Sequence, residues 1–120
     1  MQKRILVVDD DDMNLMRTKM ILGKVYDVFF ANSGVEALDT LRREKMDLVL
    51  LDIEMPRMNG IETFARMKEF AADTPVIFLT ASSQEDDVRS AIQLGAVNYL
   101  KKPYQPQELL KRVAQEFEKA

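Results

Sequence analysis

The stretch Arg4–Asn14, RILVVDDDDMN, joins a short aliphatic run to four consecutive aspartates. An apolar run without polar alternation is typical of a strand that is buried on both faces of a parallel sheet. Neighbouring carboxylates repel one another, and a buried carboxylate without a partner is costly unless it takes up a proton. The stretch therefore predicts that a positive charge missing from the sequence itself stabilises the aspartates at the end of this strand.

The rest of the chain repeats this kind of buried run, and segments with apolar residues at helical spacing separate the runs. The predicted strands are Arg4–Val8, Asp27–Ala31, Asp47–Leu51, Val76–Thr80 and Val97–Leu100. Five βα units with right-handed crossovers favour one parallel sheet with helices on both faces. We therefore predict an α/β, doubly wound, flavodoxin-like (βα)5 fold with strand order 2-1-3-4-5.

Residues typical of helix ends mark the boundaries of the predicted helices. Ser33 and Glu36 have the spacing of a capping box, and Pro106 suits the first turn of the last helix. Gly23 and Gly95 stand where a left-handed residue would close the first and the fourth helix.

Composition limits the possible functions. At 120 residues the chain has the size of one domain, and we predict a single domain over residues 1–120. Cysteine and histidine are both absent, which excludes disulfides, thiolate nucleophiles, serine–histidine triads and most transition-metal sites. A net charge of −3 and a pI near 5.0 argue against direct nucleic-acid binding. No apolar run is long enough for a membrane span or a signal peptide, so we expect a cytoplasmic location.

Polar residues follow four of the predicted strands. Asp9 and Asp10 end the first strand, Asp52 follows the third, Thr80 ends the fourth, and Lys102 follows the fifth. In the predicted strand order these positions meet at one sheet edge, around the point where the order reverses. Each residue alone has an ordinary structural role as a turn, strand or solvated residue. Together they predict a site of hard oxygen ligands with one fixed positive charge, which suits Mg²⁺ and a phosphate. The missing positive charge would then be the metal.

Two further features at the start of the first predicted helix have structural interpretations. Asp11 and Asp12 precede the helical pattern, where a carboxylate caps the helix and favours its first amides. The methionines at positions 13, 16 and 20 fit either adaptable core packing, which we favour, or a docking stripe for a partner helix.

Four separated motifs carry a resemblance to a known family. ILVVDDD (5–11), LLDIEMPRMNG (50–60), VIFLTA (76–81) and GAVNYLKKPY (95–104) resemble the motifs of response-regulator receiver domains, the phosphoacceptor half of two-component signalling. The resemblance covers nearly the whole chain, with the motifs in the same order and at matching spacing.

The resemblance implies an acceptor and a metal site. Asp52 would be the phosphoacceptor, and Mg²⁺, or Mn²⁺ in its place, would be bound by Asp10, Asp52 and the main-chain carbonyl of Glu54. Asp9 would act through metal-bound water. Glu54 also occupies a position that tunes phosphoryl hydrolysis in the family, which leaves the phosphoryl lifetime open.

The resemblance also implies phosphoryl-binding and switch residues. Lys102 would pair with the phosphoryl oxygens, Thr80 would donate a hydrogen bond to them, and Tyr99 would turn inward on activation. A cis bond between Lys102 and Pro103 is expected, and Gly60 is expected to have a structural role.

The implied partners are a sensor histidine kinase or a histidine phosphotransfer protein, and an output domain or protein. The output would contact a face formed by helix 4, strand 5 and helix 5, and a weak dimer is possible in the family. The domain would take part in its own phosphorylation and autodephosphorylation without turning over small molecules, so we do not expect an enzyme.

Two alternative functions remain open. A pseudo-receiver would keep the fold for interactions without phosphorylation, although its usual mark is loss of the acceptor or the acid pair, and both are present here. A phosphohydrolase of the haloacid-dehalogenase type would need a DxD[TV] motif after the first strand. Here Asp11 is followed by Asp12, and 120 residues leave little room for a cap domain.

Overall fold

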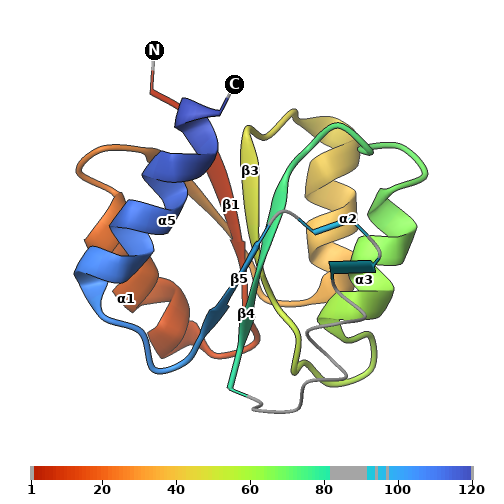
Figure 1. Ribbon diagram of the computed structural model, residues 1–120. Coiled ribbons are helices and arrows are strands. Elements are labelled where there is room, and N and C mark those ends of the chain that lie inside the picture. Colours follow the sequence, from red (N-terminus) through yellow and green to blue (C-terminus); the bar gives the residue numbers. More distant parts are fainter. Residues whose placement is uncertain (1, 82–91, 94, 97, 120) are drawn as a thin grey trace.

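Five parallel strands form one sheet in the order β2-β1-β3-β4-β5 (Figure 1). The computed structural model describes residues 2–81, 92–93, 95–96 and 98–119. The strands are β1 (Arg4–Val8), β2 (Asp27–Ala31), β3 (Leu48–Asp52), β4 (Val76–Thr80) and β5 (Asn98–Lys101). Every neighbouring pair is parallel, so the carboxyl ends of all strands lie at one edge of the sheet. The predicted fold and strand order are confirmed.

Helices cover both faces of the sheet, as Figure 1 shows. Helices α1 (Asp12–Leu22) and α5 (Pro106–Glu118) lie on one face, and α2 (Gly34–Arg43) and α3 (Gly60–Met67) lie on the other. The fourth helix that the sequence predicts falls mainly on residues 82–91, outside the described residues.

The sheet separates two hydrophobic clusters. Leu6, Leu51 and Phe78 face α2 and α3, whereas Ile5, Leu50 and Leu79 face α1 and α5. All five residues of β3 and all five of β4 are buried, because these central strands are covered on both faces. This explains why the central strands show no polar alternation in the sequence.

Two of the strands, β3 and β5, differ from the prediction by one residue at their ends. β3 begins at Leu48 rather than Asp47 and includes Asp52, and β5 ends at Lys101 rather than Leu100. Asp47 stays outside the strand because its carboxylate accepts a hydrogen bond from the backbone N–H of Arg4 at 2.7 Å. Lys101 joins the ladder opposite Thr80.

The predicted helix ends are partly correct. Ser33 accepts a hydrogen bond from the N–H of Glu36, and Pro106 occupies the first turn of α5. Gly95 has a left-handed φ of +103°, but Gly23 caps α1 with an ordinary φ of −67°, so the left-handed cap predicted there is wrong. Its N–H nevertheless closes the helix on the carbonyl of Lys19.

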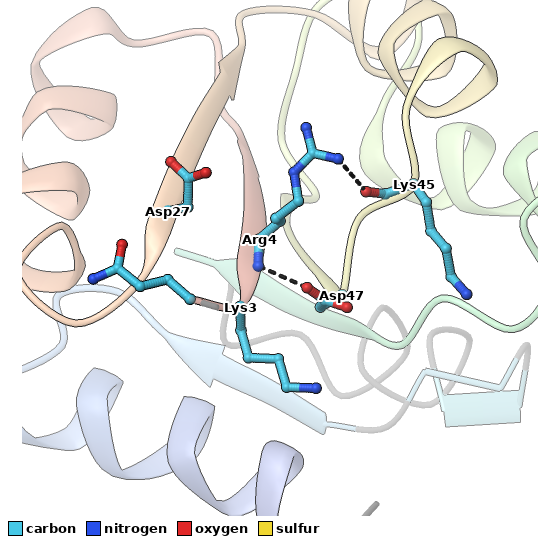
Figure 2. A pocket seen from close by; sticks show the side chains of 6 residues that line it. Lys3, Arg4, Asp27, Lys45 and Asp47 are labelled. Carbon is cyan, nitrogen blue, oxygen red and sulfur yellow. Dashed lines mark hydrogen bonds between the residues drawn. The ribbon is translucent and has the colours of Figure 1, made fainter.

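At the amino ends of the strands, charged residues line a cavity of about 700 Å³ (Figure 2). The guanidinium group of Arg4 donates to the carbonyl of Lys45 at 3.0 Å, and its backbone N–H donates to Asp47. These contacts tie β1 to the segment before β3, so we interpret the charges at this end as structural.

Among the described residues, no helix is long and apolar enough to cross a membrane.

Candidate functional site

The polar residues predicted to meet at the carboxyl edge of the sheet do meet there. Asp9 follows β1, Asp52 ends β3 and Thr80 ends β4, and each is at most 4% exposed. One carboxylate oxygen from each of Asp9, Asp10 and Asp52 lies within 4.8 Å of the other two. Asp10 is the exposed member of this acid cluster.

Lys102 places a positive charge beside two of these acids. Its Nζ lies 2.9 Å from Oδ2 of Asp9 and 3.5 Å from Oδ2 of Asp52. Lys102 reaches this position because its backbone N–H donates to the carbonyl of Thr80, which holds the segment after β5 against β4. The neighbouring Lys101 is exposed.

Burial and charge alter the protonation of this site. Burial is the main cause that raises the pKa of Asp52 to about 7. The charge of Lys102 and the backbone N–H of Glu54 oppose the change, while the charge of Asp9 and the side chain of Glu54 add to it. Burial also disfavours the charge of Lys102, but the hydrogen bond to Asp9 and the charge of Asp52 outweigh it, so the Lys102 pKa is raised. The site therefore keeps its cation and resists a second negative charge.

Asp11 and Asp12 have the structural roles predicted for them. The side chain of Asp11 accepts a hydrogen bond from the N–H of Met13 as the N-cap of α1, and Asp12 lies in the first turn. Asp9 also accepts a hydrogen bond from the N–H of Asp11 at 3.0 Å.

The side chain of Glu54 makes a contact that sequence reasoning does not predict. Thr80 Oγ1 donates a hydrogen bond of 2.6 Å to Glu54 Oε1. The backbone N–H of Glu54 donates to Oδ1 of Asp52 at 3.2 Å. The family resemblance assigns the main-chain carbonyl of Glu54 to the metal and gives its position a tuning role, but an acid two residues after a strand carries no signal of where its side chain points.

The loop after Asp52 needs glycine at position 60. A Cβ on Gly60 would overlap the carbonyl oxygen of Asp52, and the Gly60 N–H donates to the carbonyl of Ile53 at 2.9 Å. The loop thereby returns to the end of β3 and starts α3, where Asn59 and Glu62 form a full capping box. Arg57 in this loop has a left-handed φ of 68°.

The segment that carries Lys102 is anchored on α1. The peptide bond between Lys102 and Pro103 is cis, as the family resemblance implies. The hydroxyl groups of Tyr104 and Thr18 share a buried hydrogen bond of 2.9 Å, and Arg17 donates to the carbonyl of Tyr104 at 3.1 Å. The sequence does not reveal this anchor, since threonine and tyrosine in those positions are also typical of ordinary packing residues.

Tyr99 lies in edge strand β5 and is 38% exposed. Its main-chain carbonyl accepts a hydrogen bond from Arg112 of α5 at 3.2 Å. Of the face expected to transmit the signal, β5 and α5 are described, and residues 82–91 are not.

The preferred interpretation of the α1 methionines is wrong. Met13, Met16 and Met20 are 81%, 59% and 74% exposed, so they do not pack in the core. The buried residues of α1 are instead Leu15, Thr18 and Leu22. Helical periodicity predicts a face but not which of two apolar faces is buried, and α1 carries apolar residues on both.

The acid cluster suits a magnesium ion. Its three converging carboxylates are hard oxygen donors, two buried and one exposed, and the exposed member leaves room for water to complete a coordination shell. Asp9, Asp10 and Asp52 are therefore the residues that could hold the ion.

The chain matches known proteins along most of its length. A family model described as the response regulator receiver domain matches residues 5–114. The chain is 41% identical over 119 residues to the transcriptional regulatory protein CrdR of Helicobacter pylori, covering 98% of this chain and 56% of CrdR. It is 40% identical over 114 residues to the DNA-binding response regulator MtrA of Mycobacterium tuberculosis, covering 94% of this chain and 50% of MtrA. The chain thus spans about half the length of the curated relatives it matches.

Solved structures agree with these matches. A CheY-like receiver domain from Methanospirillum hungatei superposes with a TM-score of 0.94 at 31% identity, over 99% of this chain and 96% of that one. The BeF3-activated receiver domain of DrrB superposes with a TM-score of 0.90 at 33% identity, over 98% of this chain and 99% of that one. With the motifs, the fold and the acid cluster all in agreement, this chain belongs to the response regulator receiver domain family.

Proposed function

We propose that this receiver domain is a Mg²⁺-dependent switch that accepts a phosphoryl group on Asp52. The observation that carries the proposal is the environment of Asp52. Its carboxylate is 4% exposed, ends a central strand, lies 3.5 Å from the Lys102 ammonium and belongs to a cluster of three acids. A lone buried acid would be structural, but an acid with a cation and further acids at a strand end fits phosphoryl chemistry.

The transfer step follows from these groups. A carboxylate oxygen of Asp52 forms a bond to phosphorus while the phosphorus–nitrogen bond of a phosphohistidine on the donor breaks. The leaving imidazole nitrogen keeps the electron pair and takes a proton from water. Lys102 neutralises the phosphoryl oxygens, and Thr80 donates a hydrogen bond to one of them.

Mg²⁺ bound by Asp10, Asp52 and the carbonyl of Glu54 would neutralise phosphoryl charge during transfer, with Asp9 acting through bound water. Asp9 and Asp52 already share the ammonium of Lys102. This sharing holds both acids in place before a donor arrives. Hydrolysis reverses the state: water attacks phosphorus, the bond to Asp52 breaks, and inorganic phosphate leaves.

The donor is a phosphohistidine of a partner kinase or phosphotransfer protein, as the family resemblance implies, and this chain has no histidine of its own to carry the group. The exposed methionines of α1 begin beside the acid cluster and give an adaptable apolar surface for a donor helix. We propose a cytoplasmic location for the exchange. The relatives include proteins described as transcriptional regulatory or DNA-binding, so the output in a longer protein would be a DNA-binding domain.

The signal leaves through the face that includes β5 and α5. A phosphoryl group adds roughly −1.5 to −2 charges. Movement of the Thr80 hydroxyl towards it would open space for the ring of Tyr99, which is partly exposed in this structure. Phosphorylation thereby shifts a population between two arrangements rather than building a new one.

Incubation with Mg²⁺ and acetyl phosphate, followed by intact mass, tests the proposal. The parent and an Asp73→Asn control, which removes an exposed acid away from the site, should gain the mass of one phosphoryl group. Asp52→Asn should gain none, because the amide cannot attack phosphorus. Labelling of Asp52→Asn would move the acceptor to another residue. Absence of labelling in the parent would favour the pseudo-receiver alternative.

A further inference from the structure

The side chain of Glu54 connects the proposed acceptor to the proposed switch residue. Thr80 Oγ1 is buried and donates to Glu54 Oε1 at 2.6 Å, a distance typical of a strong hydrogen bond to a carboxylate. The same residue holds Asp52 through its backbone N–H at 3.2 Å. Glu54 thus contacts both the last residue of β3 and the last residue of β4.

We propose that the Glu54 carboxylate is an intramolecular competitor of the phosphoryl group for the Thr80 hydroxyl. In the unphosphorylated protein Thr80 donates its proton to Glu54, and after transfer it donates to a phosphoryl oxygen on Asp52. This inference rests on the proposed function, and it gives the Glu54 side chain a role separate from its main-chain carbonyl.

The competition follows from the chemistry of the three groups. A threonine hydroxyl has one proton to donate, so it cannot serve Glu54 and a phosphoryl oxygen at once. A carboxylate oxygen and a phosphoryl oxygen are both anionic acceptors, so Glu54 occupies the same hydrogen-bond donor that a phosphoryl group would use. Part of the interaction between the phosphoryl group and Thr80 is therefore offset by the displacement of Glu54.

Charge explains how Glu54 is released. A phosphoryl group on Asp52 brings a second anion close to the Glu54 carboxylate, and like charges at short range repel. Glu54 is an exposed residue, so its side chain has water available to receive it when it leaves Thr80. Glu54 thus favours the resting arrangement without preventing the transition.

Affinity for beryllofluoride, a tetrahedral phosphoryl analogue, tests the competition in the presence of Mg²⁺. Titrations followed by ¹⁹F NMR would compare the parent with Glu54→Ala and Glu54→Gln. Removal of the competing acceptor in Glu54→Ala should tighten binding roughly fivefold, the equivalent of one net hydrogen bond. Glu54→Gln keeps an acceptor oxygen, so its increase in affinity for beryllofluoride should be smaller. The matched control Glu69→Gln removes an exposed acid just beyond the end of α3 and should change the affinity by less than about twofold.

The same titrations in Thr80 variants separate competition from simple charge repulsion. In a Thr80→Ala background the gain from Glu54→Ala should disappear, because there is no hydroxyl to release. In a Thr80→Ser background, which keeps the hydroxyl and leaves a smaller cavity, the gain should persist. Equal gains in all three backgrounds would overturn the proposal in favour of repulsion alone, and so would the absence of any gain in the parent background.

These outcomes are distinct from failure of the proposed function. If the parent takes up neither beryllofluoride nor a phosphoryl group, the proposed function fails and Glu54 has nothing to compete with. If the parent binds and Glu54→Ala gains nothing, only the competition is refuted.

Discussion

Replacing Asp52 by asparagine should stabilise the metal-free protein. The folded state raises the pKa of this carboxyl from 3.8 to about 7, mainly through burial. A buried carboxyl with a raised pKa costs stability when it ionises, because the unfolded chain releases the same proton more easily. Asparagine has nearly the same shape, carries no charge, and keeps an oxygen that can accept the hydrogen bond from the N–H of Glu54.

The size of the effect follows from the pKa change. At about 1.36 kcal/mol per pKa unit, the rise corresponds to an upper limit of roughly 4 kcal/mol. Asparagine also loses its attraction to the Lys102 ammonium at 3.5 Å, although Lys102 keeps Asp9 at 2.9 Å. The pKa of about 7 already includes that attraction, so nothing further is subtracted, and we expect a gain of up to about 4 kcal/mol at pH 8.

The sign of the pH dependence is part of the prediction. Between about pH 4 and pH 7 folded Asp52 holds its proton while the unfolded residue has lost it, so the parent loses stability as pH rises through this window. The advantage of Asp52→Asn should therefore be largest at pH 8 and approach zero near pH 4.

Urea denaturation with EDTA, followed by circular dichroism because the chain has no tryptophan, measures the effect. Asp73→Asn, at an exposed turn, serves as the control and should stay within about 0.5 kcal/mol of the parent at every pH. A variant less stable than the parent at pH 8, or one with the parent's pH dependence, would refute the argument that Asp52 is held at an energetic cost.

Three further substitutions test other parts of the site. Lys102→Met leaves the buried carboxylates of Asp9 and Asp52 without their cation. It should lower the free energy of unfolding by about 2 kcal/mol in metal-free urea denaturation at pH 8, and by less at pH 5, where Asp52 is protonated. An equal loss at both pH values would contradict the ion-pair account. Arg57→Gly removes the strain of a left-handed φ of 68° and should raise the free energy of unfolding by about 0.5–1 kcal/mol, whereas a destabilised variant would show that the arginine side chain stabilises the loop. Thr18→Val leaves the buried Tyr104 hydroxyl without its hydrogen bond and should lower the free energy of unfolding by about 1–2 kcal/mol. The double variant with Tyr104→Phe should recover most of this loss. Additive losses would mean that the two hydroxyl groups do not interact.

Much of the fold is predictable because the central strands have both faces buried. Apolar runs without alternation, such as Val76–Thr80, are too short for a buried helix and fit a covered parallel strand. Five βα units with right-handed crossovers favour a doubly wound sheet, for which the observed strand order is a common one. The convergence of Asp9, Asp52 and Lys102 is predictable for the same reason, since the carboxyl ends of parallel strands share one edge. The sheet topology thus brings together Asp9 and Lys102, which are 93 positions apart in the sequence.

What the sequence does not predict depends on where individual side chains point. Apolar spacing favours Met16 in the core, yet a helix with apolar residues on both faces must expose one of them, and the sheet rather than the helix decides which. A glycine at position 23 favours a left-handed cap, but a helix can also end in the right-handed region when its last N–H finds a carbonyl, here that of Lys19. In each case a local pattern allows two outcomes of similar energy, and tertiary packing selects one.

The contact between Glu54 and Thr80 shows why this limit matters for function. The two residues are 26 positions apart and belong to different motifs, and the sequence assigns each to the site for a different reason: Glu54 for its carbonyl and Thr80 for its hydroxyl. Their hydrogen bond depends on a rotamer of an exposed acid, which backbone topology does not determine. The residues that hold a phosphoryl group are brought together by the order of the strands. A residue that competes for the Thr80 hydroxyl needs only a side chain long enough to contact it. Variation in the timing of such switches is therefore expected at positions like 54, where substitution changes the competition without altering the strands that build the site.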